Sequence, residues 1–159
     1  MVVVTQTLVD VMRKLGGVRM LCAYSNASEQ TINPGESAVF TTVEVPCNNG
    51  LVRARSDSFN LAGRGGCPCK QTVNYLVDFG ADISVPTGGS VEEITVAIAI
   101  GGATIPASTM TSTPTALNSY NAVSKAVVAD VWRGCCETLT VRNTSSQPIN
   151  MRNAFIVIG

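Results

Sequence analysis

The cysteines are the residues of this chain best suited to chemistry, because the sequence has six of them and no histidine. They are Cys22, Cys47, Cys67, Cys69, Cys135 and Cys136. Cys67 and Cys69 flank a proline, and Cys135 and Cys136 are adjacent. Four thiolates brought together by the fold could bind zinc, although these spacings differ from the roughly two-to-four-residue gaps of zinc ribbons. Disulfides formed in an oxidising medium, with these four cysteines as candidates and their pairing open, and buried apolar thiols are the other interpretations.

The sequence offers few side chains suited to acid–base catalysis. The absence of histidine removes the commonest general base and the Ser–His and Cys–His pairs. Asp78 and Asp82 share one face of an expected strand but lie roughly 13 Å apart along it. That distance exceeds the ~6.5–9.5 Å between the carboxylates of inverting glycosidases. We therefore assign no catalytic, cofactor-binding or metal-ligating residue and expect the protein not to be an enzyme.

Composition limits the partners of the chain. Eleven basic and eleven acidic residues give a net charge of zero, so nothing attracts nucleic acid. No run of ~20 apolar residues is present to cross a membrane. Charged residues make up 14% of the sequence, against ~25% in an average soluble domain. We therefore expect much of the surface to consist of Ser, Thr, Asn and Gln, and part of it to be buried between copies of the chain.

A period-two alternation of apolar and polar residues predicts the elements that position these side chains. In residues 73–85 every odd position is apolar, while Asn74, Asp78, Asp82 and Ser84 occupy even positions. In residues 94–100 one face carries β-branched residues and the other mostly small ones, which indicates a closely packed neighbour. Further strands are expected at 18–24, 37–45, 120–132, 138–143 and 149–158. Strands separated by Gly- and Pro-rich turns, without helices between them, predict an antiparallel sandwich or barrel.

The first seventeen residues follow a different pattern. Leu8, Val11, Met12 and Leu15 have the i, i+3, i+4, i+7 spacing of one helix face. A short amphipathic helix ending at Gly16 needs a surface to lie on, so these four residues are candidates for an anchor. An extended leader with weak helical bias is the alternative. The chain is therefore divided into an arm, residues 1–17, and a β-domain, residues 18–159.

The order of the expected elements resembles the compact jelly roll of the tumour-necrosis-factor and C1q type over residues 18–159. The stretches VDFGADISVPTGG, IAIGGATIPAS and TLTVRNTSSQPI also resemble small virion proteins of bacteriophages and prophages of gut Firmicutes. The jelly-roll resemblance implies a homotrimer in which aromatic residues of the long strands pack near the axis. The candidates are Tyr75, Phe79, Tyr120 and Phe155, and the alternative for each is the sandwich interior.

These observations lead to two functional hypotheses. The first is a bacteriophage capsid decoration or head-fibre protein, attached to a capsid or other virion protein through its N-terminal arm. Such a protein would be made in the host cytoplasm without a signal peptide and become part of the virion. The second is a receptor- or glycan-binding knob of a tail fibre or spore surface, with Trp132, Tyr24 and Tyr120 as the aromatics available for a pocket.

Overall fold

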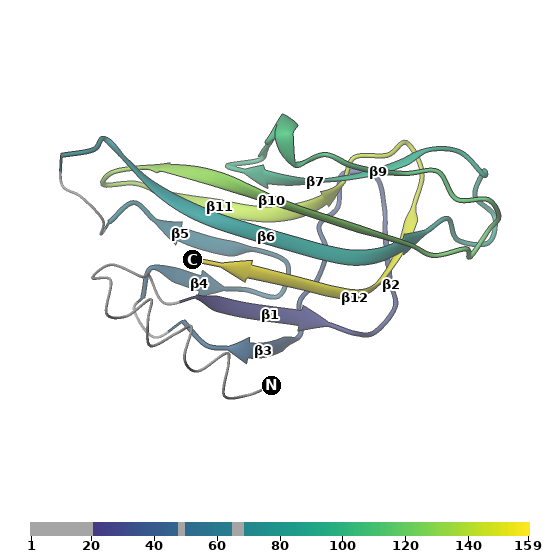
Figure 1. Ribbon diagram of the computed structural model, residues 1–159, viewed down its shortest axis with the longest axis horizontal. Helices are drawn as coiled ribbons and strands as arrows, with labels where there is room; N and C mark the ends of the chain where they lie inside the picture. Colours follow the sequence, from purple (N-terminus) through teal and green to yellow (C-terminus); the bar gives the residue numbers. More distant parts are fainter. Residues whose placement is uncertain (1–20, 48–49, 65–68) are drawn as a thin grey trace.

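The computed structural model of the protein describes residues 21–47, 50–64 and 69–159, which form two antiparallel sheets packed face to face (Figure 1). The first sheet contains β1 (Cys22–Asn26), β2 (Gln30–Ile32), β3 (Thr42–Val45), β6 (Thr72–Ser84), β10 (Asn121–Trp132) and β12 (Ile149–Ile158). The second contains β4 (Val52–Ala54), β5 (Phe59–Ala62), β7 (Ile94–Ile100), β8 (Ala103–Thr104), β9 (Met110–Ser112) and β11 (Cys136–Asn143). A single 3-10 turn, η1 (Pro106–Ser108), interrupts the strands described here.

The strand order shows that the two sheets are interleaved along the sequence. The first sheet runs β10-β6-β12-β1-β3, with β2 paired to β12, and the second runs β4-β5-β11-β7-β8, with β9 paired to β7. Each sheet therefore combines strands from both halves of the chain, and its neighbours are rarely consecutive. This arrangement is an antiparallel jelly-roll sandwich.

The core lies between the sheets, and β6 shows how the sequence determines it. The odd positions from Val73 to Ile83 point at the second sheet and are buried, whereas even positions such as Asn74 and Leu76 are exposed. Four aromatic rings join the two sheets in the interior. Tyr24 and Phe59 have ring centroids 4.9 Å apart, Phe40 and Phe59 5.5 Å, and Phe40 and Phe79 6.4 Å. The period-two prediction for this strand is confirmed.

Most of the long strands also lie where the alternation predicts them. The expected strands at 94–100, 120–132, 138–143 and 149–158 correspond to β7, β10, β11 and β12 with ends shifted by two residues at most. The strand expected at 37–45 is shorter, because only Thr42–Val45 forms β3. The strands β2, β4, β5 and β9 were not expected. Residues 1–20 lie outside the described residues, so the arm boundary at residue 17 stays a prediction.

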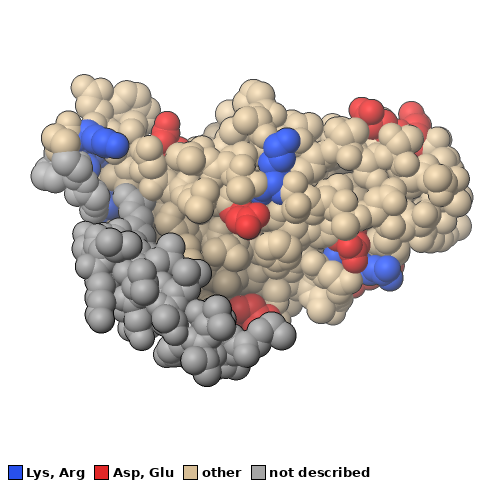
Figure 2. Space-filling model, viewed as in Figure 1, with Lys and Arg blue, Asp and Glu red and all other residues tan. Residues whose placement is uncertain are grey.

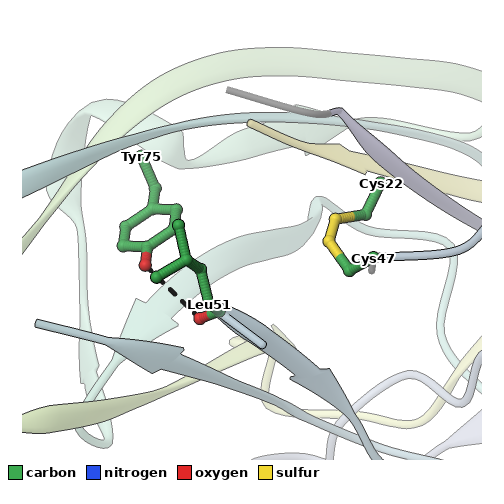
Figure 3. Close-up of a disulfide and its surroundings, with 4 residues drawn as sticks. All are labelled: Cys22, Cys47, Leu51 and Tyr75. Atoms are coloured by element: carbon green, nitrogen blue, oxygen red, sulfur yellow. Dashed lines mark hydrogen bonds between the residues drawn. A yellow bond between two sulfur atoms is a disulfide. The ribbon is translucent and has the colours of Figure 1, made fainter. Parts of the chain in front are cut away.

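A disulfide joins Cys22 to Cys47 at the β1 side of the first sheet (Figure 3). Cys22 begins β1 and Cys47 follows β3, and these two strands pair with each other. Pairing brings the two Cα atoms to 5.1 Å, within the range that a disulfide spans. Figure 3 also shows Tyr75, whose hydroxyl donates hydrogen bonds to the carbonyl oxygens of Ala62 at 2.6 Å and Leu51 at 3.3 Å.

A bulge in β12 sets the orientation of the residues near the end of the chain. The register between β12 and β6 shifts between Arg152 and Phe155, and Asn153 has a φ of 50°. The Asn153 amide donates a hydrogen bond of 2.9 Å to Asp82 across the strand pair. As a result, Ala154 is buried and Phe155 points outward. Among the described residues, none forms a helix with the length and apolar character that a membrane span requires.

Candidate functional site

Within the described part of the chain, the outer face of the first sheet exposes more large apolar side chains than the outer face of the second. Five large apolar side chains point outward from β3, β6, β10 and β12, and together they define the apolar face: Val45, Leu76, Val128, Trp132 and Phe155. Among the described residues, the strands of the second sheet contain no exposed large hydrophobic side chain. Exposed apolar residues gathered on one face of a soluble domain are typical of an interaction surface.

The strand register shows which of these side chains are neighbours. Val128 of β10 lies directly opposite Leu76 of β6, and these side chains are 56% and 52% exposed. The next outward row contains Asp78 and Ala126, and in the row beyond it Gly80 lies between Ser124 of β10 and Phe155 of β12. A Cβ atom at Gly80 would overlap the Phe155 ring, so the ring lies against the bare glycine backbone. Because Gly80 has no side chain, the Phe155 ring lies close to the backbone of β6 at this point.

Polar residues border the apolar face at the end where β12 bulges. The Arg152 guanidinium lies 3.8 Å from the centre of the Tyr120 ring, and its Nε is 3.8 Å from Asp82 Oδ2. The Tyr120 hydroxyl donates a hydrogen bond to the Glu29 carboxylate. Burial raises the pKa of Tyr120, and the hydrogen bond to Glu29 raises it further. Tyr120 is therefore held at the border of the apolar face as a neutral hydrogen-bond donor.

The outer face of the second sheet is different in character. Its outward positions include Asn60, Thr138 and Thr140, and the small side chains of Ala97 and Ala99 are buried there. Arg142, the register partner of Ala97, donates hydrogen bonds to the carbonyl oxygens of Gly35 at 2.7 Å and Gly102 at 3.1 Å. This contact fits the close packing that the small residues of β7 indicated. Figure 2 views the molecule from the side of the first sheet, and on that side charged side chains are few and scattered.

The aromatic candidates from the sequence separate into interior and surface residues. Tyr75 and Phe79 are 1% and 0% exposed, so their assignment to a subunit interface is wrong. Both occupy odd positions of β6, which face the second sheet, and this is the alternative that the sequence left open. Phe155 belongs to the apolar face, whereas Tyr120 lies at its border. Leu76 and Val128 were not predicted from the sequence as interface residues. Both are apolar residues at even positions of their strands, β6 and β10, where the other residues are mostly polar or small, and this pattern could have identified them.

Of the four cysteines that the sequence offered as disulfide candidates, the structure supports Cys69 and contradicts Cys135 and Cys136. Cys135 and Cys136 are free and exposed, so a disulfide at this pair is not what the structure shows. Cys69 is disulfide-bonded, and Cys22 and Cys47, which the sequence did not single out, form the bridge described above. Among the described residues, no group of three or more potential ligands could hold a metal ion. Cys67 and the anchor candidates Leu8, Val11, Met12 and Leu15 lie outside the described residues.

The comparisons with known proteins define the class of fold. No protein-family model matches the chain, and no curated protein matches its sequence. The globular domain of zebrafish complement 1qA has a TM-score of 0.54 at 10% identity, covering 87% of this chain and 92% of that one. Murine APRIL has a TM-score of 0.56 at 10% identity, covering 87% and 95%. The protein therefore has a jelly-roll fold of the TNF/C1q type, as the sequence predicted, and at this identity the likeness concerns the fold alone.

Proposed function

We propose that this protein is a non-enzymatic structural module that assembles into a homotrimer through its apolar face. The observation that carries the proposal is the concentration of Leu76, Val128, Trp132 and Phe155 on one sheet face, opposite a polar one. A half-exposed leucine or valine gains roughly 1 kcal/mol when a partner covers it. Assembly of copies therefore stabilises a surface that is costly to leave in water.

The resemblance to jelly rolls of the TNF/C1q type, in which copies pack about a threefold axis, supports a trimer as the assembled state. The low charge content is consistent with it, because 14% charged residues leave few groups that would resist burial. The polar outer face of the second sheet then remains on the outside of the assembly. Charge neutrality gives the trimer no electrostatic attraction to nucleic acid.

The biological setting that we propose is the surface of a bacteriophage particle. In this setting the trimer is a capsid decoration or head-fibre protein, and residues 1–17 attach it to the shell. The support is the resemblance of three sequence stretches to small phage virion proteins. The receptor- or glycan-binding knob is less well supported, because Tyr24, one of its three aromatics, is only 5% exposed.

The oligomeric state is tested by light scattering on a sizing column, with and without reductant. We expect a species near three times 16.6 kDa in both conditions, because the contacts of the apolar face are not covalent. A monomer at all concentrations would overturn the proposal. A trimer that persists only without reductant would place the contact at the cysteines instead.

The virion role is tested separately with capsids of a phage or prophage whose genome encodes this chain. The full chain should co-sediment with these capsids, and a chain lacking residues 1–17 should remain in solution as a trimer. Co-sedimentation of the shortened chain would refute the anchor. Failure of both chains to bind, with the trimer intact, would refute the capsid role and leave the assembly unaffected.

A further inference from the structure

A hollow of about 260 Å³ opens where the second sheet meets the turn between β10 and β11, at the left in Figure 1. Arg53, Asn60, Arg64, Cys135 and Cys136 line it. Its size is near the lower end of small-molecule sites. The two thiols are the free cysteines among the described residues, and both are exposed. None of the described residues that line the hollow is a carboxylate.

The strand register explains why these side chains come together. Arg53 of β4 is the partner of Asn60 in β5, and Ala62 of β5 is the partner of Cys136 in β11. Their neighbour Leu61 points into the core, so Arg53, Asn60 and Cys136 lie on the opposite, outer face. The short side chain of Ala62 leaves space between the arginine and the thiol.

The turn that carries the thiols is firmly held. The Gly63 amide donates a 2.7 Å hydrogen bond to the Cys135 carbonyl, and the Gly134 amide donates one of 2.9 Å to the Gly63 carbonyl. A Cβ atom at Gly63 would overlap the backbone of this turn. Arg133 adds a 2.8 Å hydrogen bond from its side chain to the Lys70 carbonyl. The backbone that carries both thiols is therefore held in place before any ligand arrives.

The other cysteines indicate the redox conditions in which these thiols exist. Cys22 and Cys47 are bridged and Cys69 is disulfide-bonded, so the folded chain is compatible with a disulfide-forming medium. Cys135 and Cys136 nevertheless remain free. Adjacent side chains in an extended segment point to opposite faces, which disfavours a bond between them. Two accessible thiols thus remain available for a partner from outside.

We propose that this hollow is a thiol–disulfide exchange site for small acidic disulfides, with oxidised glutathione as the model reagent. The Cys136 thiolate sulfur attacks one sulfur of the disulfide, and a new sulfur–sulfur bond forms as the old one breaks. The second half leaves as a thiolate and takes up a proton equivalent to the one that Cys136 lost. The product is a protein carrying one mixed disulfide, with no change in the total number of disulfides.

The arginines select the charge of the reagent. Arg53 and Arg64 are exposed guanidinium groups, and they would attract the carboxylates of the reagent before the sulfur atoms meet. Exposed charges are screened by salt, so the preference should weaken as ionic strength rises. Arg53 and Cys136 belong to strands of the second sheet, whereas the apolar face is formed by strands of the first.

The test measures the rate of mixed-disulfide formation by intact-protein mass spectrometry, using three reagents. These are oxidised glutathione, which is acidic, 2-hydroxyethyl disulfide, which is neutral, and cystamine, which is basic. At low salt the acidic reagent should react roughly tenfold faster than the basic one. The combined substitution Arg53→Gln and Arg64→Gln should remove this difference and leave the rate with the neutral reagent unchanged.

Matched variants make the outcome decisive. Arg55→Gln changes the net charge at an exposed arginine that does not line the hollow, and it should leave the selectivity intact. Cys136→Ser should abolish the preference for the acidic reagent, because Cys136 is the thiol on the face that carries Arg53, and Cys135→Ser should retain that preference. Equal rates with acidic and basic reagents, a preference that persists in Cys136→Ser, or oxidation that yields only a Cys135–Cys136 bond would each overturn the proposal.

Discussion

Leu76 offers the sharpest test of the apolar face, because its side chain is 52% exposed and lies opposite Val128. Full burial of a leucine is worth about 1.5–3 kcal/mol, so covering the exposed half contributes about 1 kcal/mol in each subunit. Leu76→Ala removes most of this gain three times in a trimer, about 3 kcal/mol in all. The association constant then falls roughly 150-fold.

The observable effect is smaller, because trimer formation depends on the square of the monomer concentration. The concentration at which half of the chains are assembled should rise by the square root of the change in the constant, about 12-fold. Sedimentation velocity over a dilution series measures this midpoint. Leu76→Asp should leave a folded monomer, since a carboxylate buried without a partner costs several kcal/mol per subunit.

Val91→Ala is the matched control. Val91 is 51% exposed and lies outside the strands, so its truncation removes a similar exposed side chain away from the apolar face. The control should leave the midpoint of assembly where it is. An unchanged midpoint for Leu76→Ala, or an equal shift for Val91→Ala, would refute the assignment of the interface. Circular dichroism of each variant verifies that the monomer is folded.

Three further predictions concern the folded chain itself. Cys22→Ser opens a loop with a sequence separation of 25 residues, so we expect the free energy of unfolding to fall by about 3 kcal/mol in urea denaturation. Reductant, which also opens the disulfide of Cys69, should lower the stability of the native chain at least as much. Tyr75→Phe leaves the buried Ala62 carbonyl without its 2.6 Å donor, and calorimetry should show a loss of about 1–2 kcal/mol; an unchanged melting temperature would contradict this. Burial raises the pKa of Tyr24 above its ordinary value of 10.0. The stability that the buried, protonated phenol contributes is therefore complete below pH 10 and is lost as the pH rises through the folded pKa. In alkaline titrations, the free energy of unfolding of Tyr24→Phe should fall less steeply with pH than that of the native chain.

The sequence by itself determined the long strands. Alternation is a local property of the chain, since successive side chains of a strand point to opposite faces whatever the strand packs against. Residues 73–85 therefore revealed β6 and its buried odd positions, and the order of elements was enough to indicate a jelly roll. Strands of three residues, such as β2 (Gln30–Ile32) and β9 (Met110–Ser112), are too short for a period to be recognised.

Only the tertiary structure decided which apolar residues face another part of the same chain and which face outward. Tyr75 and Phe155 both fit an apolar surface, and the sequence does not distinguish a second sheet from a second subunit as the partner. The bulge at Asn153 turned Phe155 outward, and the pairing of β1 with β3 selected Cys22 and Cys47 for the disulfide. Both depend on contacts between strands, which local periodicity does not encode. The hollow beside Cys136 arose in the same way, because its arginine and its thiol come from strands more than eighty residues apart.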